Sequence, residues 1–348
     1  KLISLCYKKL SMSKKNSSVN LKNGFKDYKD LSAIFLNFKK KLDFLKKKKY
    51  LVAVSGGPDS LALVALAKAY TFCKKTKFHY LLVDHNIRKN SSQEAKKVKN
   101  LLKKENINLK VLLNKKKITK NIQAEARNVR YDILKTFCKK NNIKVILTAH
   151  NLEDQVETFL IRLSRGSGLK GLSAMKSMSK INSQVILFRP LLDVQKQFLI
   201  RISKIIFGKY FKDPSNKNQK YLRTKVRNLK KPLEKSGIKY EQIFKSIQNL
   251  SQSKTTLDEY LIKIFKEYIK KSDGRILINF KKYKDLNKDI KIAVINQSIK
   301  QLKSNYYDLR SKKVENLIIK LDKKDFKNTT LGGCIFFKKG EYLCLKTE

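Results

Sequence analysis

Short apolar runs alternate with amphipathic stretches along the first two fifths of the chain. The runs are continuous rather than alternating, and they cover residues 50–54, 78–84, 107–113 and 143–148. Between and after them, apolar residues recur at helical spacing over 60–72, 92–104, 121–140 and 152–163. Continuous apolar strands separated by helices are typical of a parallel sheet that is covered on both faces. We therefore predict an α/β fold with a doubly wound, mainly parallel sheet.

Two further regions flank this pattern. A Lys-, Ser- and Asn-rich tail of residues 1–25, which we expect to be disordered, precedes a helix predicted over 28–45. After a shift in composition near Pro232, helical spacing returns over 240–269, 290–302 and 313–321. The last apolar runs, 334–337 and 342–345, flank Lys-Lys-Gly-Glu in a pattern typical of a β-hairpin. We predict a main domain over 26–232 and a smaller α+β domain over 233–348.

The composition indicates a folded chain in a reducing compartment. Apolar residues make up 41% of the 348 residues, and no run approaches the ~18 apolar residues of a membrane span. The five cysteines are scattered without C-x-x-C spacing, which favours free thiols over a disulfide framework. We expect a cytoplasmic protein, or one of an organellar matrix or stroma. The chain starts without Met and without a signal-peptide pattern, and Met12 is a candidate start.

The chain is strongly basic. Lys and Arg number 81 against 28 Asp and Glu, which gives a net charge of +53. Such an excess favours a polyanionic partner, most obviously nucleic acid. Mutational bias is a second explanation, since Lys, Asn and Ile are abundant together, as an AT-rich genome would produce. Arginine is more informative because lysine cannot copy its forked donors, and nine of the eleven arginines lie between Arg88 and Arg227.

A small polar turn, SGGPDS at residues 55–60, separates the first apolar strand from its helix. A strand, a glycine turn and a helix together favour an anion, because backbone N–H groups and the helix dipole point at it. Pro58 fixes φ early in the turn, and Asp59 or Ser60 can cap the helix. The turn therefore predicts a phosphate site. It is not a G-x-x-x-x-G-K-[ST] loop, because it holds no lysine.

The turn resembles the loop with which ATP pyrophosphatases, the PP-loop enzymes, bind pyrophosphate. Five motifs follow it in order: VDHNIR (83–88), NIQAEARNVRYDIL (121–134), TAHNLEDQVETFLIRLSRGSGLKGLSAM (148–175), RPLL (189–192) and DPSNKNQKYLRTKVRNLKKPL (213–233). Together these motifs resemble the tRNA(Ile)-lysidine synthetase family from about Tyr50 to Leu233. The resemblance implies an adenine nucleotide alpha-hydrolase-like PP-loop catalytic domain over 26–232, and contacts with tRNA from 233–348.

The resemblance also implies a reaction. Such an enzyme joins free lysine to C2 of the wobble cytidine in an isoleucine tRNA with the anticodon CAU. ATP first adenylylates the C2 oxygen and releases pyrophosphate, and the lysine amine then displaces AMP to give lysidine. The expected cofactors are ATP, as a substrate, and Mg²⁺. The expected partners are the tRNA and free lysine, with no membrane; a homodimer is left open.

The family resemblance assigns roles to single residues. The ATP-binding residues are Ser55, Gly56, Gly57, Pro58, Asp59 and Ser60. Asp59 is suited to a Mg²⁺ ion that bridges phosphates. His85 and His150 each directly follow a strand, where open parallel sheets bind ligands. Arg127 would stabilise the charge that develops during adenylyl transfer. The predicted catalytic set is Asp59, His85, Arg127 and Asp154.

Two charged pairs complete the predicted site. Asp154 and Glu157 share one helix face and can hold the ammonium of lysine or Mg²⁺. Arg223 and Arg227 share a face for contacts with the tRNA backbone. Plainer explanations exist for all of these positions: packed histidines, a solvated acidic helix start and a solvated basic face. The family usually has two Asp where this chain has Glu153-Asp154, which leaves a metal contact from Glu153 open.

Three other functions compete with this interpretation. A tRNA thiolation enzyme shares the loop but needs cysteines for sulfur transfer or an iron–sulfur cluster, and this chain has no C-x-x-C. A non-catalytic RNA-binding protein would explain the charge but not the intact polar loop. A small-molecule amidating synthetase would have no use for a basic second domain.

Overall fold

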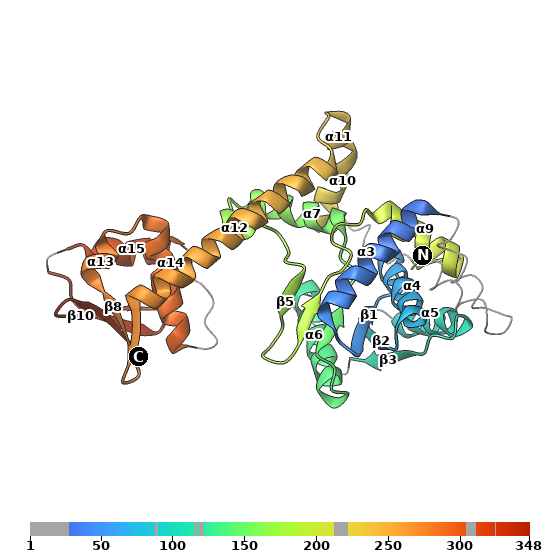
Figure 1. Cartoon of the computed structure of the whole chain (residues 1–348), viewed down its shortest axis with the longest axis horizontal. Coiled ribbons are helices and arrows are strands. Elements are labelled where there is room, and N and C mark those ends of the chain that lie inside the picture. Colours follow the sequence, from blue (N-terminus) through green and yellow to red (C-terminus); the bar gives the residue numbers. More distant parts are fainter. Residues whose placement is uncertain are drawn as a thin grey trace. The chain divides into compact units, whose positions relative to one another are not determined.

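The structure is a computed structural model that describes residues 28–87, 90–114, 116, 118, 122–211, 222–303, 311–323 and 325–348. The chain divides into two compact units, Lys1–Leu250 and Ser251–Glu348. The division falls within the long helix α12 (Tyr240–Tyr268), whereas the predicted boundary at 232–233 lies before it (Figure 1). That boundary stays a prediction, and the predicted tail, 1–25, lies outside the described residues.

The N-terminal unit alternates strands and helices (Figure 1). Its strands are β1 (Lys49–Val54), β2 (Lys77–Asp84), β3 (Leu109–Leu113), β4 (Val145–Leu147), β5 (Met178–Lys180) and β6 (Ile186–Phe188). Its helices before α12 are α3 (Lys29–Leu45), α4 (Pro58–Cys73), α5 (Ser91–Lys104), α6 (Ile122–Lys140), α7 (Leu152–Leu163), α8 (Leu169–Leu172), α9 (Lys196–Phe207), α10 (Leu222–Asn228) and α11 (Lys230–Lys235). The sequence pattern predicted every element up to α7 to within a residue or two, and missed β5, β6 and α8 to α11.

The strands form one six-stranded sheet in the order β3-β2-β1-β4-β6-β5. All neighbours are parallel except β5, which pairs antiparallel with β6. Val54 at the end of β1 pairs with Leu82 of β2, and Val52 pairs with Leu147 at the end of β4. The carboxyl ends of these strands therefore lie along one edge. The predicted α/β class and mainly parallel sheet are confirmed.

Both faces of the sheet are buried, which explains the continuous apolar runs. Successive side chains of a strand point to opposite faces, and Leu51 and Val52 are both fully buried. Val52 belongs to a core that includes residues of α3, α4, α5 and α9. Leu51 belongs to a second core, which includes Leu134 and Phe137 of α6. Helices thus cover both faces, as a doubly wound fold requires.

The chain order reverses its direction across the sheet between β1 and β4. From β1 the chain proceeds outward through β2 and β3, and then returns to the other side of β1 as β4. At such a switch point the connections leaving the two strands diverge and open a crevice at their carboxyl ends, where α/β proteins bind ligands. Helix α4 begins directly after β1 and α7 soon after β4. The predicted loop and the TAH motif therefore flank one crevice.

The C-terminal unit is built on an antiparallel sheet in the order β7-β8-β11-β10-β9. Its strands are β7 (Ile269–Ser272), β8 (Arg275–Asn279), β9 (Thr329–Leu331), β10 (Cys334–Lys339) and β11 (Tyr342–Thr347). Its helices after α12 are α13 (Phe280–Lys284), α14 (Lys288–Leu302) and α15 (Ser311–Leu321). Val294, Leu317 and Phe336 are buried in its separate apolar core. The predicted terminal hairpin is β10 and β11.

The hairpin of β7 and β8 was missed by the sequence analysis, which continued the preceding helix to residue 269. Asp273 and Gly274 connect its strands, and both have positive φ, +47° and +72°. An Asp-Gly pair between two short strands is a strong hairpin signal for this reason, and it stood in the sequence.

In the part of the chain that the structure describes, none of the helices combines the length and the apolar character that crossing a membrane requires.

Candidate active site

The loop between β1 and α4 requires glycine at position 56. Gly56 has φ +83°, a left-handed conformation that glycine adopts without steric cost. A Cβ atom at this position would lie 2.5 Å from Cγ2 of Val98, so α5 also approaches too closely for a side chain. Gly57 precedes α4 with extended backbone, and Pro58 takes the first helical position, where no N–H is needed. The loop therefore brings its backbone directly to the start of a helix.

Two serines join the ends of this loop. Ser60 Oγ accepts a hydrogen bond from the backbone N–H of Ser55 at 3.2 Å and donates one to the carbonyl of Gly57 at 2.9 Å. The hydroxyl oxygens of Ser55 and Ser60 lie 3.1 Å apart. Ser60 is buried, whereas Ser55 is exposed. The hydroxyl of Ser55 is therefore the one available to a bound molecule.

Asp59 has an unusual environment at the start of α4. Its Oδ1 is buried and has no hydrogen-bond partner among the described residues, and its Oδ2 lies 3.9 Å from Nζ of Lys196. Burial raises the pKa of the Asp59 carboxyl to about 6. The nearby carboxylates of Asp154 and Glu153 act in the same direction, and the ammonium of Lys196 and the side chain of Asn151 oppose them. A buried carboxylate oxygen without a partner is suited to receive a cation.

A capping box positions the carboxylate of Asp154 on α7. The side chain of Asn151 accepts from the backbone N–H of Asp154 at 2.9 Å, and Oδ2 of Asp154 accepts from the backbone N–H of Asn151 at 3.2 Å. Oδ1 of Asp154 then accepts from Nη2 of Arg223 at 3.0 Å. The cap fixes the rotamer of Asp154 at the edge where the loop begins.

The carboxylate of Glu157 on α7 is held between two arginines. Glu157 accepts from Nε of Arg223 at 2.8 Å and from Nε and Nη2 of Arg227 at 2.7 and 3.0 Å. Only 3% of the Glu157 side chain is exposed. The hydrogen bonds to Glu157 raise the pKa of the Arg227 guanidinium. The residues predicted to bind lysine and those predicted to bind tRNA therefore form one ion-pair cluster.

Glu153 has a structural partner rather than a place at the loop. Its Oε2 accepts from the backbone N–H of Lys196 at 2.9 Å, and its Oε1 accepts from Nζ of Lys230 at 3.1 Å. Lys196 is the first residue of α9, so Glu153 satisfies a free N–H at that helix start. The extra methylene of Glu over Asp gives the carboxylate this reach.

His150 lies among arginines at the end of β4. Its Nδ1 is 3.0 Å from Oγ1 of Thr148. Burial, together with the positive charges of four arginines, lowers its pKa to about 3; these are Arg189, Arg127, Arg223 and Arg130. His150 is therefore neutral at physiological pH. A neutral ring beside several guanidiniums makes this side of the crevice suitable for an anion.

Two of these arginines differ in accessibility. Arg127 is exposed on α6, and its guanidinium lies 5.1 Å from the ring centre of Tyr131. Arg189 is buried at the end of β6 and donates to the carbonyl of Lys176 at 2.8 Å and to the hydroxyl of Ser179 at 3.0 Å. Arg127 can therefore reach a ligand, whereas Arg189 fastens β5 to the sheet.

The first predicted histidine, His85, follows β2. Burial and the charge of Arg130 lower its pKa, against the attraction of Asp84. Its Nδ1 is buried without a hydrogen-bond partner among the described residues. His85 therefore stays neutral, with a ring nitrogen that can still receive or donate a proton. Arg88 of the same motif lies outside the described residues.

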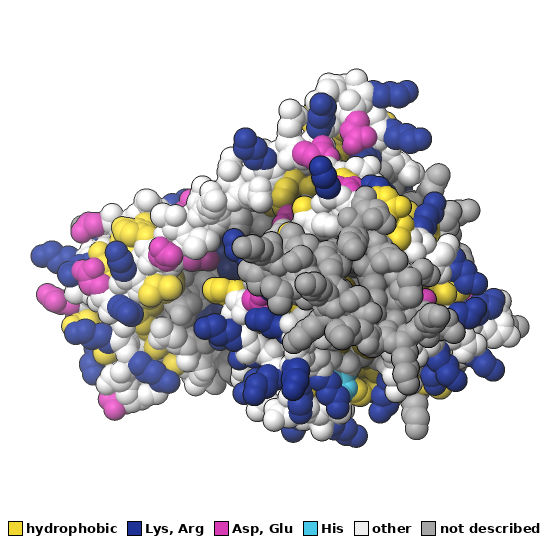
Figure 2. Space-filling model, turned by 45° about the vertical axis from the view of Figure 1, so that its right-hand side comes forward, with side chains coloured by type: hydrophobic (Ala, Val, Ile, Leu, Met, Phe, Trp, Pro, Cys, Tyr) yellow, Lys and Arg dark blue, Asp and Glu magenta, His cyan; other side chains and the backbone are white. Residues whose placement is uncertain are grey.

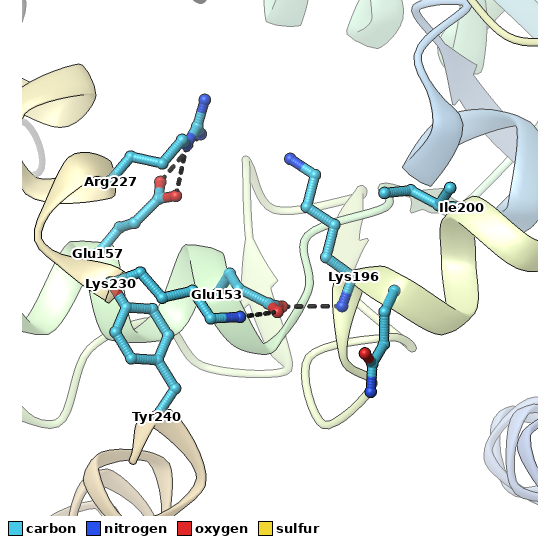
Figure 3. A pocket seen from close by; sticks show the side chains of 8 residues that line it. Glu153, Glu157, Lys196, Ile200, Arg227, Lys230 and Tyr240 are labelled. Carbon is cyan, nitrogen blue, oxygen red and sulfur yellow. Dashed lines mark hydrogen bonds and ion pairs between the residues drawn. The ribbon is translucent and has the colours of Figure 1, made fainter. Parts of the chain in front are cut away.

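A pocket of about 250 Å³ lies beside the ion-pair cluster (Figure 3). Lys230 of α11 and Arg227 of α10 point toward the carboxylates of α7, whereas Lys196 of α9 meets Glu153 through its backbone N–H and extends its side chain away. Its lining residues are Glu153, Glu157, Lys196, Gln197, Ile200, Arg227, Lys230 and Tyr240. Nζ of Lys230 also lies 5.1 Å from the ring centre of Tyr240. The pocket is thus lined by buried carboxylates, each already facing a cation.

The structure gathers most of the predicted site residues around one edge. The electrostatic influence of Asp154 on Asp59, and of Asp59 on Arg227, links the loop with α7 and α10. Sequence reasoning left Lys196 and Lys230 unassigned. Lys230 lies inside the motif 213–233 and Lys196 follows RPLL by only a few residues, but nothing in the sequence distinguishes them from the many other lysines. Their roles depend on contacts with α4 and α7 that the linear spacing does not reveal.

A family model described as the PP-loop domain matches residues 29–233, more than half of the chain. A tRNA(Ile)-lysidine synthase of Wolbachia pipientis wMel is 35% identical over 304 residues, which cover 85% of this chain and 70% of that protein. The tRNA(Ile)-lysidine synthase of Wolbachia sp. subsp. Brugia malayi (strain TRS) is 32% identical over 335 residues, covering 95% of this chain and 75% of that protein. This chain belongs to the tRNA(Ile)-lysidine synthase family. The resemblance of the motifs is therefore confirmed, together with the predicted ligase class and ATP-binding domain.

A solved structure shares the fold at lower identity. It is the U34-tRNA thiolase NcsA from Methanococcus maripaludis with its [4Fe-4S] cluster, at 19% identity and a TM-score of 0.54, covering 64% of this chain and 80% of that one. This likeness shows the common PP-loop architecture only. In the described part of this chain, no group of three or more His, Cys, Asp or Glu side chains could hold a metal ion.

Proposed function

We propose that this enzyme ligates lysine to C2 of the wobble cytidine in an isoleucine tRNA with a CAU anticodon. The AMP part of ATP is transferred to the C2 oxygen and pyrophosphate leaves, and the lysine amine then displaces AMP. The observation that carries the proposal is the position of the SGGPDS loop. It opens onto a sheet edge shared with the carboxylates of α7 and the arginines around His150. Membership of the family supports the same reaction.

The loop residues Ser55, Gly56, Gly57, Pro58, Asp59 and Ser60 would hold the phosphates of ATP. Asp59 fits a Mg²⁺ ion, because it presents a buried oxygen without a partner in the described structure. Mg²⁺ usually takes one or two protein carboxylates and completes its shell with phosphates and water. When bound, the ion would neutralise phosphate charge during adenylyl transfer. Such a site needs no cluster of protein ligands.

Arg127 is suited to the α-phosphate during adenylylation. Its exposed guanidinium and the neighbouring arginines make the crevice beside His150 electropositive. Charge that develops on the transferred phosphate is stabilised by such preorganised donors. His85 stays neutral with one ring nitrogen unpaired in the described structure, and we assign it a proton transfer at the cytidine or the attacking amine.

The ion-pair cluster of α7 and α10 is suited to free lysine. Lysine carries two amines that can be charged and a carboxylate, so its recognition requires acidic and basic groups side by side. Asp154 and Glu157 supply carboxylates, and Arg223 and Arg227 supply guanidiniums within 3.0 Å of them. Binding would exchange these internal pairs for pairs with the substrate, at little cost in unpaired charge. Assignment of Arg223 and Arg227 to the tRNA backbone stays a prediction, and their present donors face inward.

The net charge of +53 suits a tRNA partner (Figure 2). Lys and Arg side chains are spread over the face shown, and Asp and Glu are far fewer. Because each neutralised phosphate releases counterions, tRNA affinity should fall steeply with salt, on the order of 100-fold or more between 50 and 200 mM. A flat response would mean that the charge reflects composition. Cytoplasmic location and a homodimer stay predictions of the sequence.

The decisive experiment incubates the enzyme with [α-³²P]ATP, lysine and an isoleucine tRNA that carries a wobble cytidine. Radioactive AMP should appear only when tRNA is present, and it should remain attached to the tRNA when lysine is withheld. Replacing the wobble cytidine with uridine provides the matched control, and this tRNA should neither accept AMP nor support its release. If AMP release is independent of tRNA, or if sulfide replaces lysine as the acceptor, the reaction belongs to another PP-loop class, such as tRNA thiolation.

A further inference from the structure

The PP-loop of this chain holds no basic residue, yet its reaction must release a highly charged group. P-loop NTPases place a lysine on the terminal phosphates from within the loop. Here residues 55–60 contribute hydroxyls, amides and the carboxylate of Asp59, all without positive charge. The pyrophosphate that leaves during adenylylation carries several negative charges. A cation from elsewhere in the fold is therefore expected near the loop.

Lys196 is in place to supply that cation. Its Nζ lies 3.9 Å from Oδ2 of Asp59, the second residue of α4, and about a third of its side chain is exposed. We propose that Lys196 binds the β- and γ-phosphates of ATP and stabilises pyrophosphate as it leaves. This inference rests on the ATP-dependent reaction proposed above and adds a catalytic residue to it.

The backbone around Lys196 is fixed relative to the loop. Its N–H donates to Glu153, which is itself held by Lys230. About two turns later on α9, Ser203 Oγ donates to the carbonyl of Pro58 at 2.5 Å. The start of α9 is therefore tied to both helices that border the crevice. Figure 3 shows the side chain of Lys196 extending away from Glu153, so its ammonium is not used by that carboxylate.

The flexible stem of lysine suits a contact that changes during the reaction. A Mg²⁺ ion bound to Asp59 would repel the ammonium of Lys196 from that carboxylate. The ammonium would then be attracted to the phosphates. The cytidine oxygen attacks the α-phosphorus, and the bond from this phosphorus to the oxygen shared with the β-phosphorus breaks. Pyrophosphate leaves with the electron pair of that bond. Lys196 stays protonated throughout and contributes charge only.

The test compares binding of AMPPNP with binding of AMP, by calorimetry at constant Mg²⁺ and without tRNA, so that no acceptor for AMP is present. Lys196→Met should weaken AMPPNP about 10- to 100-fold, the effect of one charged hydrogen bond, and leave AMP affinity within about 2-fold. Lys196→Arg should restore most of the AMPPNP affinity. Lys204→Met is the matched control, because Lys204 is an exposed lysine on the same helix.

Contrary results are equally clear. Unchanged AMPPNP affinity in Lys196→Met, or an equal loss for AMPPNP and AMP, would overturn the phosphate contact. If Lys196→Met does not fold, as judged by circular dichroism, Lys196→Gln replaces it in the same comparison. Failure of the proposed ligation is a separate result: the wild-type enzyme would then release no AMP with tRNA and lysine, while the selective loss of AMPPNP binding would still be measurable.

Discussion

The two units of this chain bury different kinds of side chain. In the N-terminal unit, Asp84, Glu153, Glu157 and Arg189 are all buried, together with several hydroxyl and amide side chains. In the described part of the C-terminal unit, Ser298 is the buried polar residue, and the rest of its core is apolar. Both units nevertheless share the same lysine-rich surface composition.

This difference indicates that the N-terminal unit contains the catalytic groups and that the C-terminal unit does not. Burying a charge is costly unless it is paired, so charged groups accumulate inside a fold where they are paired for a purpose. In the N-terminal unit they gather at the carboxyl edge of the parallel sheet, around Asp59 and His150. The C-terminal unit has no comparable cluster among its described residues, and its contribution is expected to be a basic surface for tRNA.

The strongest test of this contrast is Asp59→Ala. Loss of the carboxylate that we assign to Mg²⁺ should lower tRNA adenylylation by about 1,000-fold, because phosphate charge is left unneutralised. Affinity for tRNA should change by less than about 2-fold, since the basic surface is intact. Adenylylation is followed with [α-³²P]ATP and tRNA affinity by filter binding. Near-normal turnover would remove Asp59 from the catalytic set.

Phe336→Ala tests the independence of the second core. Phe336 is fully buried in the C-terminal unit, and truncation of such a residue typically costs about 3–5 kcal/mol. Urea unfolding should show an early transition, with tRNA affinity lost and binding of AMPPNP retained. Tyr260→Ala, at an exposed position, serves as the control. A single transition in which nucleotide binding is lost as well would contradict two separate cores.

Glu157→Gln sharpens the role of the buried charges. The substitution keeps the shape of the side chain but removes the charge shared by Arg223 and Arg227. We expect an apparent KM for lysine raised about 10-fold, with kcat less affected, as when a uniform binding contact is lost. Adenylylated tRNA should still form without lysine. Glu259→Gln, at an exposed position of α12, is the control.

The opposite outcome for Glu157 is also informative. If Glu157→Gln leaves the KM for lysine unchanged but abolishes adenylylation, Glu157 belongs with the metal and phosphate groups. The ion-pair cluster would then position the loop rather than bind lysine.

Asp59→Asn should stabilise the free enzyme while inactivating it. The folded pKa of Asp59, about 6, lies above the ordinary value of 3.8. Between these values the native protein binds a proton that the unfolded chain releases, so stability falls as pH rises from about 4 to 6. Asn removes this loss and should gain about 3 kcal/mol at pH 7, since one pKa unit corresponds to about 1.4 kcal/mol.

The gain from Asp59→Asn should be small near pH 4, where the folded carboxyl is protonated and the unfolded one is only about half ionised. Thermal unfolding without nucleotide or Mg²⁺, at pH 4 and at pH 7, measures it. An equal effect at both values would mean that desolvation of the charge is not what raises this pKa.

The sequence alone determined the sheet, its class and the loop that defines the family. A continuous apolar run predicts a strand that is buried on both faces. The helical spacing of apolar residues between these runs can likewise be read from residues that are close in the sequence. The SGGPDS turn works through backbone conformation, which Gly56 and Pro58 dictate at their own positions. Missed elements such as β5 and β6 are three residues long, too short for any periodicity to be recognised.

Tertiary structure decided the partners of the charged residues. Asp154 and Glu157 were predicted to share a face, but their pairing with Arg223 and Arg227 depends on α10 packing beside α7. Glu153 was left open as a metal contact, and the fold turns it toward the start of α9. The approach of Lys196 to Asp59 joins residues more than a hundred positions apart. An ion pair acts over a few ångströms, and in a chain with 81 basic residues only the folded backbone selects which of them come that close.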